Sequence, residues 1–190
     1  DSNFSWQEFL RRNNDELVAT YGNLVHRILS FTNRNFEAMV PSPGELDAQS
    51  HLLLHKAEIA LSNVDKSLYS CKFRRAIREA MFLAQEANRY LDDQAPWKTI
   101  KKEREAAAKS VYTVLAVLSA LRIIFYPFLP FSSEKLHSLL GFEGTVDKAD
   151  WSLQLPVPGR RLPQPQALFT KLDDGIVAQE SSRLGQVSGD

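Results

Sequence analysis

The sequence predicts an all-α fold: an antiparallel bundle of four to five helices followed by an irregular C-terminal tail. Apolar residues recur at intervals of three and four through most of the first 140 residues, which is typical of amphipathic helices. Prolines and glycines separate these segments and crowd the region after residue 141. We therefore divide the chain into a helical domain at 1–141, an extended proline-rich tail at 142–174 and a disordered end at 175–190.

Three amphipathic helices are expected in the first half of the chain. The first starts near Asn13 and ends before Pro41, and a second covers about 46–68. The third covers about 73–93 and stops before Pro96, because a proline disfavours helical geometry in the residue before it. The apolar stripes of the first and third helices are Leu17, Tyr21, Leu24, Ile28 and Phe31, and Phe73, Ile77, Ala80, Met81, Ala84, Ala87 and Leu91.

The fourth predicted helix is the most apolar part of the chain. Pro96 suits its first turn, and from Val111 onward it is apolar on nearly all sides. A helix of that kind lies inside a bundle. Arg122 near the centre of this stretch makes a membrane span unfavourable by about 2.5–3.5 kcal/mol, so we expect a buried helix and no membrane partner. A short fifth helix ends at Gly141.

Composition excludes several classes of protein. The 23 basic and 23 acidic residues cancel, which excludes a uniformly basic nucleic-acid binder but leaves room for a local basic face. The one cysteine, Cys71, cannot form an internal disulfide, and this fits a reducing, cytoplasmic location. His51 and His55 stand four residues apart but lack further metal ligands. Because phosphate-binding and nucleophile motifs are also missing, we predict no catalytic residue, metal or cofactor in this chain.

Polar residues form stripes on two of the predicted helices. Gly22 precedes the first stripe inside a helix, where it costs about 1 kcal/mol relative to alanine. Such a glycine usually allows a close approach to the backbone, either by another helix or by a ligand, and both alternatives stay open. The second stripe, taken alone, is typical of a solvated edge. The two stripes are Asn23, Arg27, Ser30 and Arg34, and Arg74, Arg78, Gln85 and Arg89.

Trp97 stands in an otherwise polar run after a helix end and a proline. A tryptophan in this position can cap the corner of a bundle. However, five basic residues against two acidic ones follow between Lys98 and Lys109, and an aromatic platform beside positive charge is how proteins hold unstacked bases. If nucleic acid binds here, the residues expected at its backbone are Lys98, Lys101, Lys102 and Arg89.

Four motifs resemble the anticodon-binding domain of methionyl-tRNA synthetases. The run Tyr21–Arg27 resembles the family's first helix, and Asn88–Leu91 leads into a second match, Gln94–Trp97. The segment Leu121–Pro130 is shared more widely among class I synthetases with helical anticodon domains, and Leu168–Lys171 resembles the family's closing segment. The resemblance covers nearly the whole chain to about residue 174.

The resemblance implies a base-reading site for the first base of a CAU anticodon. Asn23 and Arg27 would hydrogen-bond the Watson–Crick edge of the cytosine, since asparagine offers a donor and an acceptor and arginine five donors. Trp97 would stack on the base, and Pro96 would shape the pocket. Asp92 lies where the family often has an acid that repels wrong anticodons.

The resemblance also implies that the chain is the C-terminal part of a methionine–tRNA ligase, which charges methionine tRNA using ATP with Mg²⁺. The family's His-Ile-Gly-His and Lys-Met-Ser-Lys-Ser signatures do not occur here, so we expect tRNA binding without activation of methionine. The partners expected are the tRNA and the parent's catalytic domain, toward which the tail would fold. Two alternatives are a helical protein-interaction module with Trp97 buried, and the anticodon domain of a sister class I synthetase.

Overall fold

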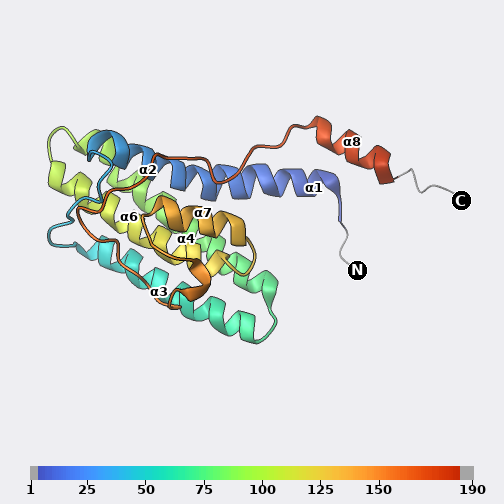
Figure 1. Ribbon diagram of the computed structural model, residues 1–190, viewed down its shortest axis with the longest axis horizontal. Coiled ribbons are helices and arrows are strands. Elements are labelled where there is room, and N and C mark those ends of the chain that lie inside the picture. Colours follow the sequence, from blue (N-terminus) through green and yellow to red (C-terminus); the bar gives the residue numbers. More distant parts are fainter. Residues whose placement is uncertain (1–3, 185–190) are drawn as a thin grey trace, which may run out of the picture.

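The computed structural model describes residues 4–184 and confirms the all-α fold: apart from one isolated bridge between Met39 and Arg161, its regular elements are helices. In Figure 1, α4 and α6 lie at the centre, α3 packs against both along the lower edge, and a long N-terminal rod of three consecutive elements runs along the opposite side. The elements are α1 (Trp6–Arg11), η1 (Arg12–Gly22), α2 (Asn23–Asn35), α3 (Ala48–Tyr69), α4 (Phe73–Gln94), α5 (Pro96–Thr99), α6 (Arg104–Phe125), α7 (Pro130–Leu139), η2 (Val146–Lys148) and α8 (Gly175–Leu184).

The N-terminal rod begins earlier than its sequence indicates. The first helix starts at Trp6, with the Ser5 side chain accepting the Glu8 N–H at 3.1 Å, so the predicted start near Asn13 is wrong. Residues of η1 are wound as a π-helix, with hydrogen bonds five residues apart. The side chains of Asn13 and Asn14 do not cap a helix. They donate to the carbonyl oxygens of residues 170 and 172, at 3.2 and 3.0 Å, and so tie the C-terminal segment to the rod.

The α3–α4 hairpin agrees with the sequence to within about two residues at each end. Asp47 caps α3 by accepting the Ser50 N–H at 2.8 Å. Farther along, the hydroxyls of Ser50 and Tyr90 lie 2.8 Å apart, and Lys56 donates to the buried carboxylate of Glu86. These polar pairs fix the register in which the two helices pack.

The fourth predicted helix is two helices. After Pro96 the chain makes only the short α5, and the Lys102 and Glu103 N–H groups both bond the Thr99 carbonyl in a tight turn before α6 begins. Arg104, at the start of α6, donates to the Asn35 carbonyl at 2.7 Å and lies over the Phe36 ring. It thereby closes the C-terminal end of α2. The expectation of one continuous helix from Pro96 is therefore wrong.

Helix α6 is the buried core helix that the sequence predicts. It is long and apolar enough to cross a membrane, yet 94% of its most apolar stretch of 18 residues is buried inside the bundle. Arg122, fully buried, donates to His137 Nδ1 at 2.9 Å and to Gln154, and its guanidinium lies 4.0 Å from the Phe142 ring centre. Burial lowers the pKa of Arg122 to about 10, against a small opposing effect of Glu134. This arginine links α6 to α7 and to the tail.

The segment after α7 lies along the bundle itself. Trp151 donates its indole N–H to the Leu61 carbonyl at 2.9 Å, and the Lys135 ammonium donates to the Ala167 carbonyl at 3.0 Å. Phe169 then reaches Gly22, where an added Cβ would lie 3.1 Å from its ring. Neither alternative raised for Gly22, another helix or a ligand, is therefore right: the close approach is made by the tail.

A helix, α8, occupies most of the region where we predicted disorder. The Asp173 carboxylate accepts the Gly175 N–H at 2.8 Å, and Glu180 and Arg183 form an ion pair at 2.6 Å. In Figure 1, α8 and α1 project together from one end of the bundle, and the two helices are in contact. Residues 185–190 of the predicted disordered end lie outside the described part of the chain.

Candidate nucleic-acid interface

Three of the residues named from the sequence meet where α2, α4 and α5 come together. Arg27 on α2 donates to the Asp92 carboxylate on α4 at 2.7 Å. Its guanidinium carbon lies 4.9 Å from the centre of the Trp97 ring on α5, a cation–π distance. The planar guanidinium is thus held between a carboxylate and an aromatic ring, and its remaining N–H groups are available to a ligand.

A strained turn places Trp97 in this cluster. Ala95, which links α4 to α5, has a left-handed backbone with φ of 41°, while its N–H still bonds the Leu91 carbonyl at 3.0 Å. Pro96 follows as the first residue of α5 and is buried. The chain therefore reverses sharply and leaves the Trp97 side chain 42% exposed beside Arg27. The prediction of a buried corner tryptophan, which belongs to the interaction-module alternative, is wrong.

Asn23 lies one turn before Arg27 on α2 and is exposed. Because residues four apart share one helix face, the two side chains point to the same side of α2. Among the described residues, the Asn23 amide has no hydrogen-bond partner, whereas Asn88 on α4 donates to the Thr20 carbonyl at 3.0 Å. The latter bond fixes α4 against the rod, and so helps to set the relative position of Arg27 and Asp92.

The basic residues predicted at an RNA backbone differ in their surroundings. Lys98, Lys101 and Lys102 are exposed on and just after α5, and within residues 4–184 none of them pairs with a carboxylate. Arg89 is also exposed, but lies 2.6 Å from Glu86 on its own helix. The three lysines therefore form an unneutralised basic edge next to Trp97.

Comparisons with known proteins identify the family of the chain. A family model described as the anticodon binding domain of methionyl tRNA ligase matches residues 40–188, more than half of the chain. The chain belongs to this family. A second model, described as tRNA synthetases class I (M), matches residues 1–29. Arg27 therefore lies in the range that the class I synthetase model matches, whereas Asp92 and Trp97 lie in the range that the anticodon-binding model matches.

Individual relatives support the same assignment. The chain is 54% identical over 185 residues to the methionine–tRNA ligase of Dehalococcoides mccartyi strain CBDB1, and 42% identical over 210 residues to that of Roseiflexus sp. strain RS-1. Each alignment covers 97% of this chain but 34% and 35% of the relative, so the chain spans about a third of their length. The apo form of Mycobacterium tuberculosis methionyl-tRNA synthetase superimposes with a TM-score of 0.83 at 26% identity, over 90% of this chain and 35% of that one.

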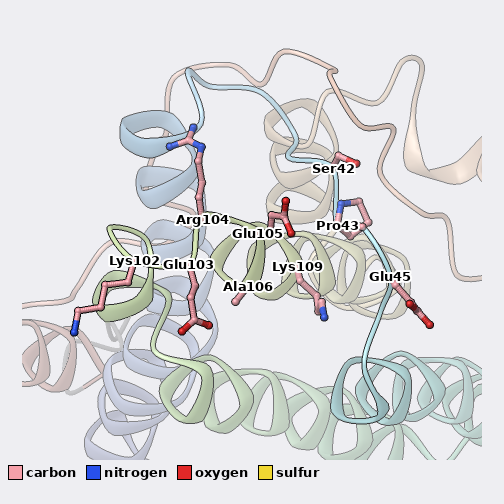
Figure 2. Close-up of a pocket in the computed structure, with 10 residues that line it drawn as sticks. Ser42, Pro43, Glu45, Lys102, Glu103, Arg104, Glu105, Ala106 and Lys109 are labelled. Carbon is pink, nitrogen blue, oxygen red and sulfur yellow. The ribbon is translucent and has the colours of Figure 1, made fainter.

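A cleft of about 840 Å³ lies beside this site, between the loop at 42–45 and the start of α6. Figure 2 shows that Arg104 points toward the end of α2, while Lys102 points in the opposite direction and away from Glu45. The cleft walls mix cations with three carboxylates, those of residues 45, 103 and 105. Because these carboxylates repel phosphate, the cleft is less suited to an RNA backbone than the edge at Lys98 and Lys101, and Lys102 belongs to both.

Two features of the site went unnoticed in the sequence. The first is the left-handed turn at Ala95, for which the only signal is a polar run directly before a proline. The second is the ion pair of Arg27 with Asp92: we named both residues, but assigned to the acid only a role in repelling wrong bases. The histidines considered as metal ligands are both exposed, and His55 lies 3.3 Å from Glu58 on the same helix.

Proposed function

We propose that this chain recognises the CAU anticodon of methionine tRNA and is the anticodon-binding module of a methionine–tRNA ligase. The observation that supports this most directly is the cluster itself, in which Arg27 lies between the Asp92 carboxylate and the exposed Trp97 ring. Membership in the methionyl-tRNA ligase anticodon-binding family supports the same function.

Each residue of the cluster has a task in this proposal. Trp97 provides a stacking surface for the first anticodon base, an interaction worth about 1–3 kcal/mol per base. Arg27 and Asn23 provide the donors and the acceptor that meet the base edge, and the buried ring of Pro96 supports the floor of the pocket. Lys98, Lys101 and Lys102, with Arg89 beyond them, bind the backbone of the loop.

Asp92 gives the site its preference for cytosine. Its carboxylate only accepts hydrogen bonds, and it lies 2.7 Å from Arg27, so it holds the guanidinium plane in one orientation. Cytosine presents a donating amino group where uracil presents an accepting oxygen. A carboxylate at this position is therefore compatible with cytosine and repels uracil, which distinguishes a CAU anticodon from a UAU anticodon.

The remaining steps belong to the longer protein in which such a domain works. The chain spans about a third of its relatives, and a solved structure of the Mycobacterium tuberculosis enzyme contains methionyl-adenylate. We place the ATP, the Mg²⁺ and the transfer of methionine in a catalytic domain, with this chain supplying tRNA recognition in the cytoplasm. The C-terminal segment, which leads to α8 beside α1, then contacts that domain from the end of the bundle where both helices project.

The decisive experiment compares two substitutions in the 190-residue chain. Trp97→Ala removes the stacking surface and should weaken binding of a CAU anticodon hairpin by roughly 5- to 150-fold, while binding of a UAU hairpin changes little. Lys101→Ala, the matched variant from the basic edge, should weaken both hairpins equally and lower the salt dependence of binding. Equal damage to both hairpins by Trp97→Ala would contradict the proposal, because the residue would then not read a base.

A further inference from the structure

The outer face of α4 has a basic stripe, and the two arginines of this stripe nearest the start of the helix are not used by the proposed anticodon site. Arg74 and Arg78 are exposed, and among residues 4–184 neither lies within ion-pair distance of a carboxylate. Gln85 and Arg89 are exposed on the same side of the helix. Two exposed arginines without acidic partners give the start of α4 a local excess of positive charge, which an anionic ligand would neutralise.

The stripe is aligned with the base-reading cluster along α4. Arg74 and Asp92 are about five turns apart on α4, so they lie on one line along the helix, separated by about 27 Å. Arg78, Gln85 and Arg89 fall within about 60° of that line. An RNA that enters the cluster at Asp92 can therefore follow the stripe to the other end of α4.

The acidic residues of α4 between these ends point elsewhere. Glu79 accepts a hydrogen bond from Asn63 of α3 at 3.3 Å. Glu86 is buried and accepts a hydrogen bond from Lys56, also of α3. Glu86 also holds Arg89 at 2.6 Å, so the arginines nearer the start of α4 are the ones left free. The free positive charge of the stripe therefore lies in the first two turns of α4, and no carboxylate of this helix is interleaved with it.

The direction of the stripe matches the direction that a bound RNA must take. The first residues of α4 lie toward the end of the molecule from which α1 and α8 project (Figure 1). Residues 1–29, which include α1, match the model of class I tRNA synthetases. An RNA whose loop is held at Trp97 and whose remainder reaches a synthetase body at that end therefore passes along α4.

We propose that Arg74 and Arg78 bind the phosphate backbone of the RNA stem whose loop is held at Trp97. This inference rests on the proposed function. Guanidinium groups pair with phosphate through two parallel hydrogen bonds, and contacts of this kind position a nucleic acid without reading its sequence. The two arginines therefore add affinity for the stem and leave the choice of anticodon to the cluster.

The test measures binding of fluorescent RNAs to the 190-residue chain over a range of salt concentrations. The RNAs are a CAU hairpin with a full anticodon stem, its UAU counterpart, and a CAU loop oligonucleotide without a stem. The variant is Arg74→Ala/Arg78→Ala. The matched control is Lys148→Ala/Arg161→Ala, which removes two exposed cations from the tail.

The stripe variant should bind both hairpins roughly tenfold more weakly at low salt, with the salt slope reduced by about 0.7–0.9 for each phosphate that the protein no longer neutralises. Binding of the stemless loop, and the ratio of CAU to UAU affinity, should stay unchanged. The control variant should bind all three RNAs as the unaltered chain does. If the unaltered chain binds the CAU and UAU hairpins equally well, the proposed function is contradicted. The difference in salt slope between the unaltered chain and the stripe variant would still show whether Arg74 and Arg78 contact RNA.

Three results would overturn the stripe assignment. Unchanged hairpin affinity and salt slope in the stripe variant would show that the arginines do not contact RNA, and would leave an acidic protein surface as their partner. An equal loss of affinity for the stemless loop would place them at the loop and not at the stem. An equal loss in the control variant would show a general effect of charge.

Discussion

Ala95 determines where the aromatic ring of the proposed site lies. Its left-handed backbone turns the chain between α4 and α5, and thereby brings Trp97 beside Arg27. A residue with a Cβ pays about 1–2 kcal/mol for this conformation, a cost that glycine avoids. The sequence keeps alanine at a position where glycine is the favoured helix-ending residue.

We expect Ala95→Gly to increase the free energy of unfolding by about 1 kcal/mol, because the strain disappears while the turn keeps its shape. Urea denaturation followed by circular dichroism measures this change. Ser62→Gly is the matched control: it introduces glycine at an exposed position inside α3 and should lower the free energy of unfolding by about 0.5–1 kcal/mol. Destabilisation by both substitutions would show that the turn at Ala95 is not strained.

The individual site residues could be predicted only in part from the sequence. Asn23, Arg27 and Trp97 were named because their motifs resemble a family, since composition and periodicity alone left a solvated stripe and a corner tryptophan as open alternatives. The contact of Arg27 with Asp92 could not be foreseen, because 65 residues separate them and their distance depends on how α2 packs against α4.

At the scale of elements, helices with a long apolar stripe were predicted well and the junctions were not. The hairpin of α3 and α4 and the buried α6 follow directly from hydrophobic periodicity and proline positions. The π-helix η1 was missed because its stripe also fits an ordinary helix, and the break before α6 was missed because neither proline nor glycine marks it. That break depends on Arg104, which closes the end of α2 through a contact distant in sequence.

The start of α3 depends on a charged cap. Burial raises the pKa of Asp47, but the hydrogen bonds from Ser50 and the positive charge of Lys109, 3.6 Å away, outweigh this effect and hold the pKa below its usual value. Because the folded pKa is lower than the unfolded pKa, the unfolded chain binds more protons in the acidic range. The stabilisation is therefore present above the unfolded pKa and is lost as the pH falls through the folded one.

We expect Asp47→Ala to lower the free energy of unfolding by about 1 kcal/mol near neutral pH, the usual cost of removing an N-cap. The difference from the unaltered chain should shrink as the pH falls below about 4, the pKa of an aspartate in an unfolded chain, toward the lower pKa of the folded cap. Urea denaturation at neutral and acidic pH tests this. Asp65→Ala, at an exposed position inside α3, is the control with little expected effect, and a difference that stays constant or widens at low pH would contradict the account.

At the scale of the whole molecule, the C-terminal segment differs most from what its composition suggests. We expected an extended tail that packs on a catalytic domain, which stays a prediction, and a disordered end. The described part of that segment lies on the bundle and leads into α8. Its contacts are made one at a time, by residues such as Trp151 and Phe169, with partners far away in sequence. No periodic pattern accompanies such contacts, so sequence analysis could not detect them.

The proposed base-reading cluster and the proposed phosphate-binding arginines lie in different parts of the molecule. The cluster of Arg27, Asp92 and Trp97 lies where three helices meet, and the basic stripe of α4 leads from it toward the end where α1 and α8 project. In the two proposals taken together, one end of the bundle selects the anticodon, and the arginines near the start of α4 align the RNA with the rest of a synthetase. The central claim of the proposal is that the first anticodon base is bound on the Trp97 ring and that Asp92 selects cytosine there.

The most direct test of that claim is a fluorescence titration of a chain in which Trp6 and Trp151 are replaced by phenylalanine, so that Trp97 is the only tryptophan. The chain is titrated at low salt with a CAU anticodon hairpin and with a UAU hairpin that differs in one base. We predict that the CAU hairpin quenches the emission at concentrations where the UAU hairpin has little effect, because the Asp92 carboxylate repels uracil and so keeps it from the position in which a base stacks on the ring. Equal quenching by both hairpins, or no change with either, would contradict the account.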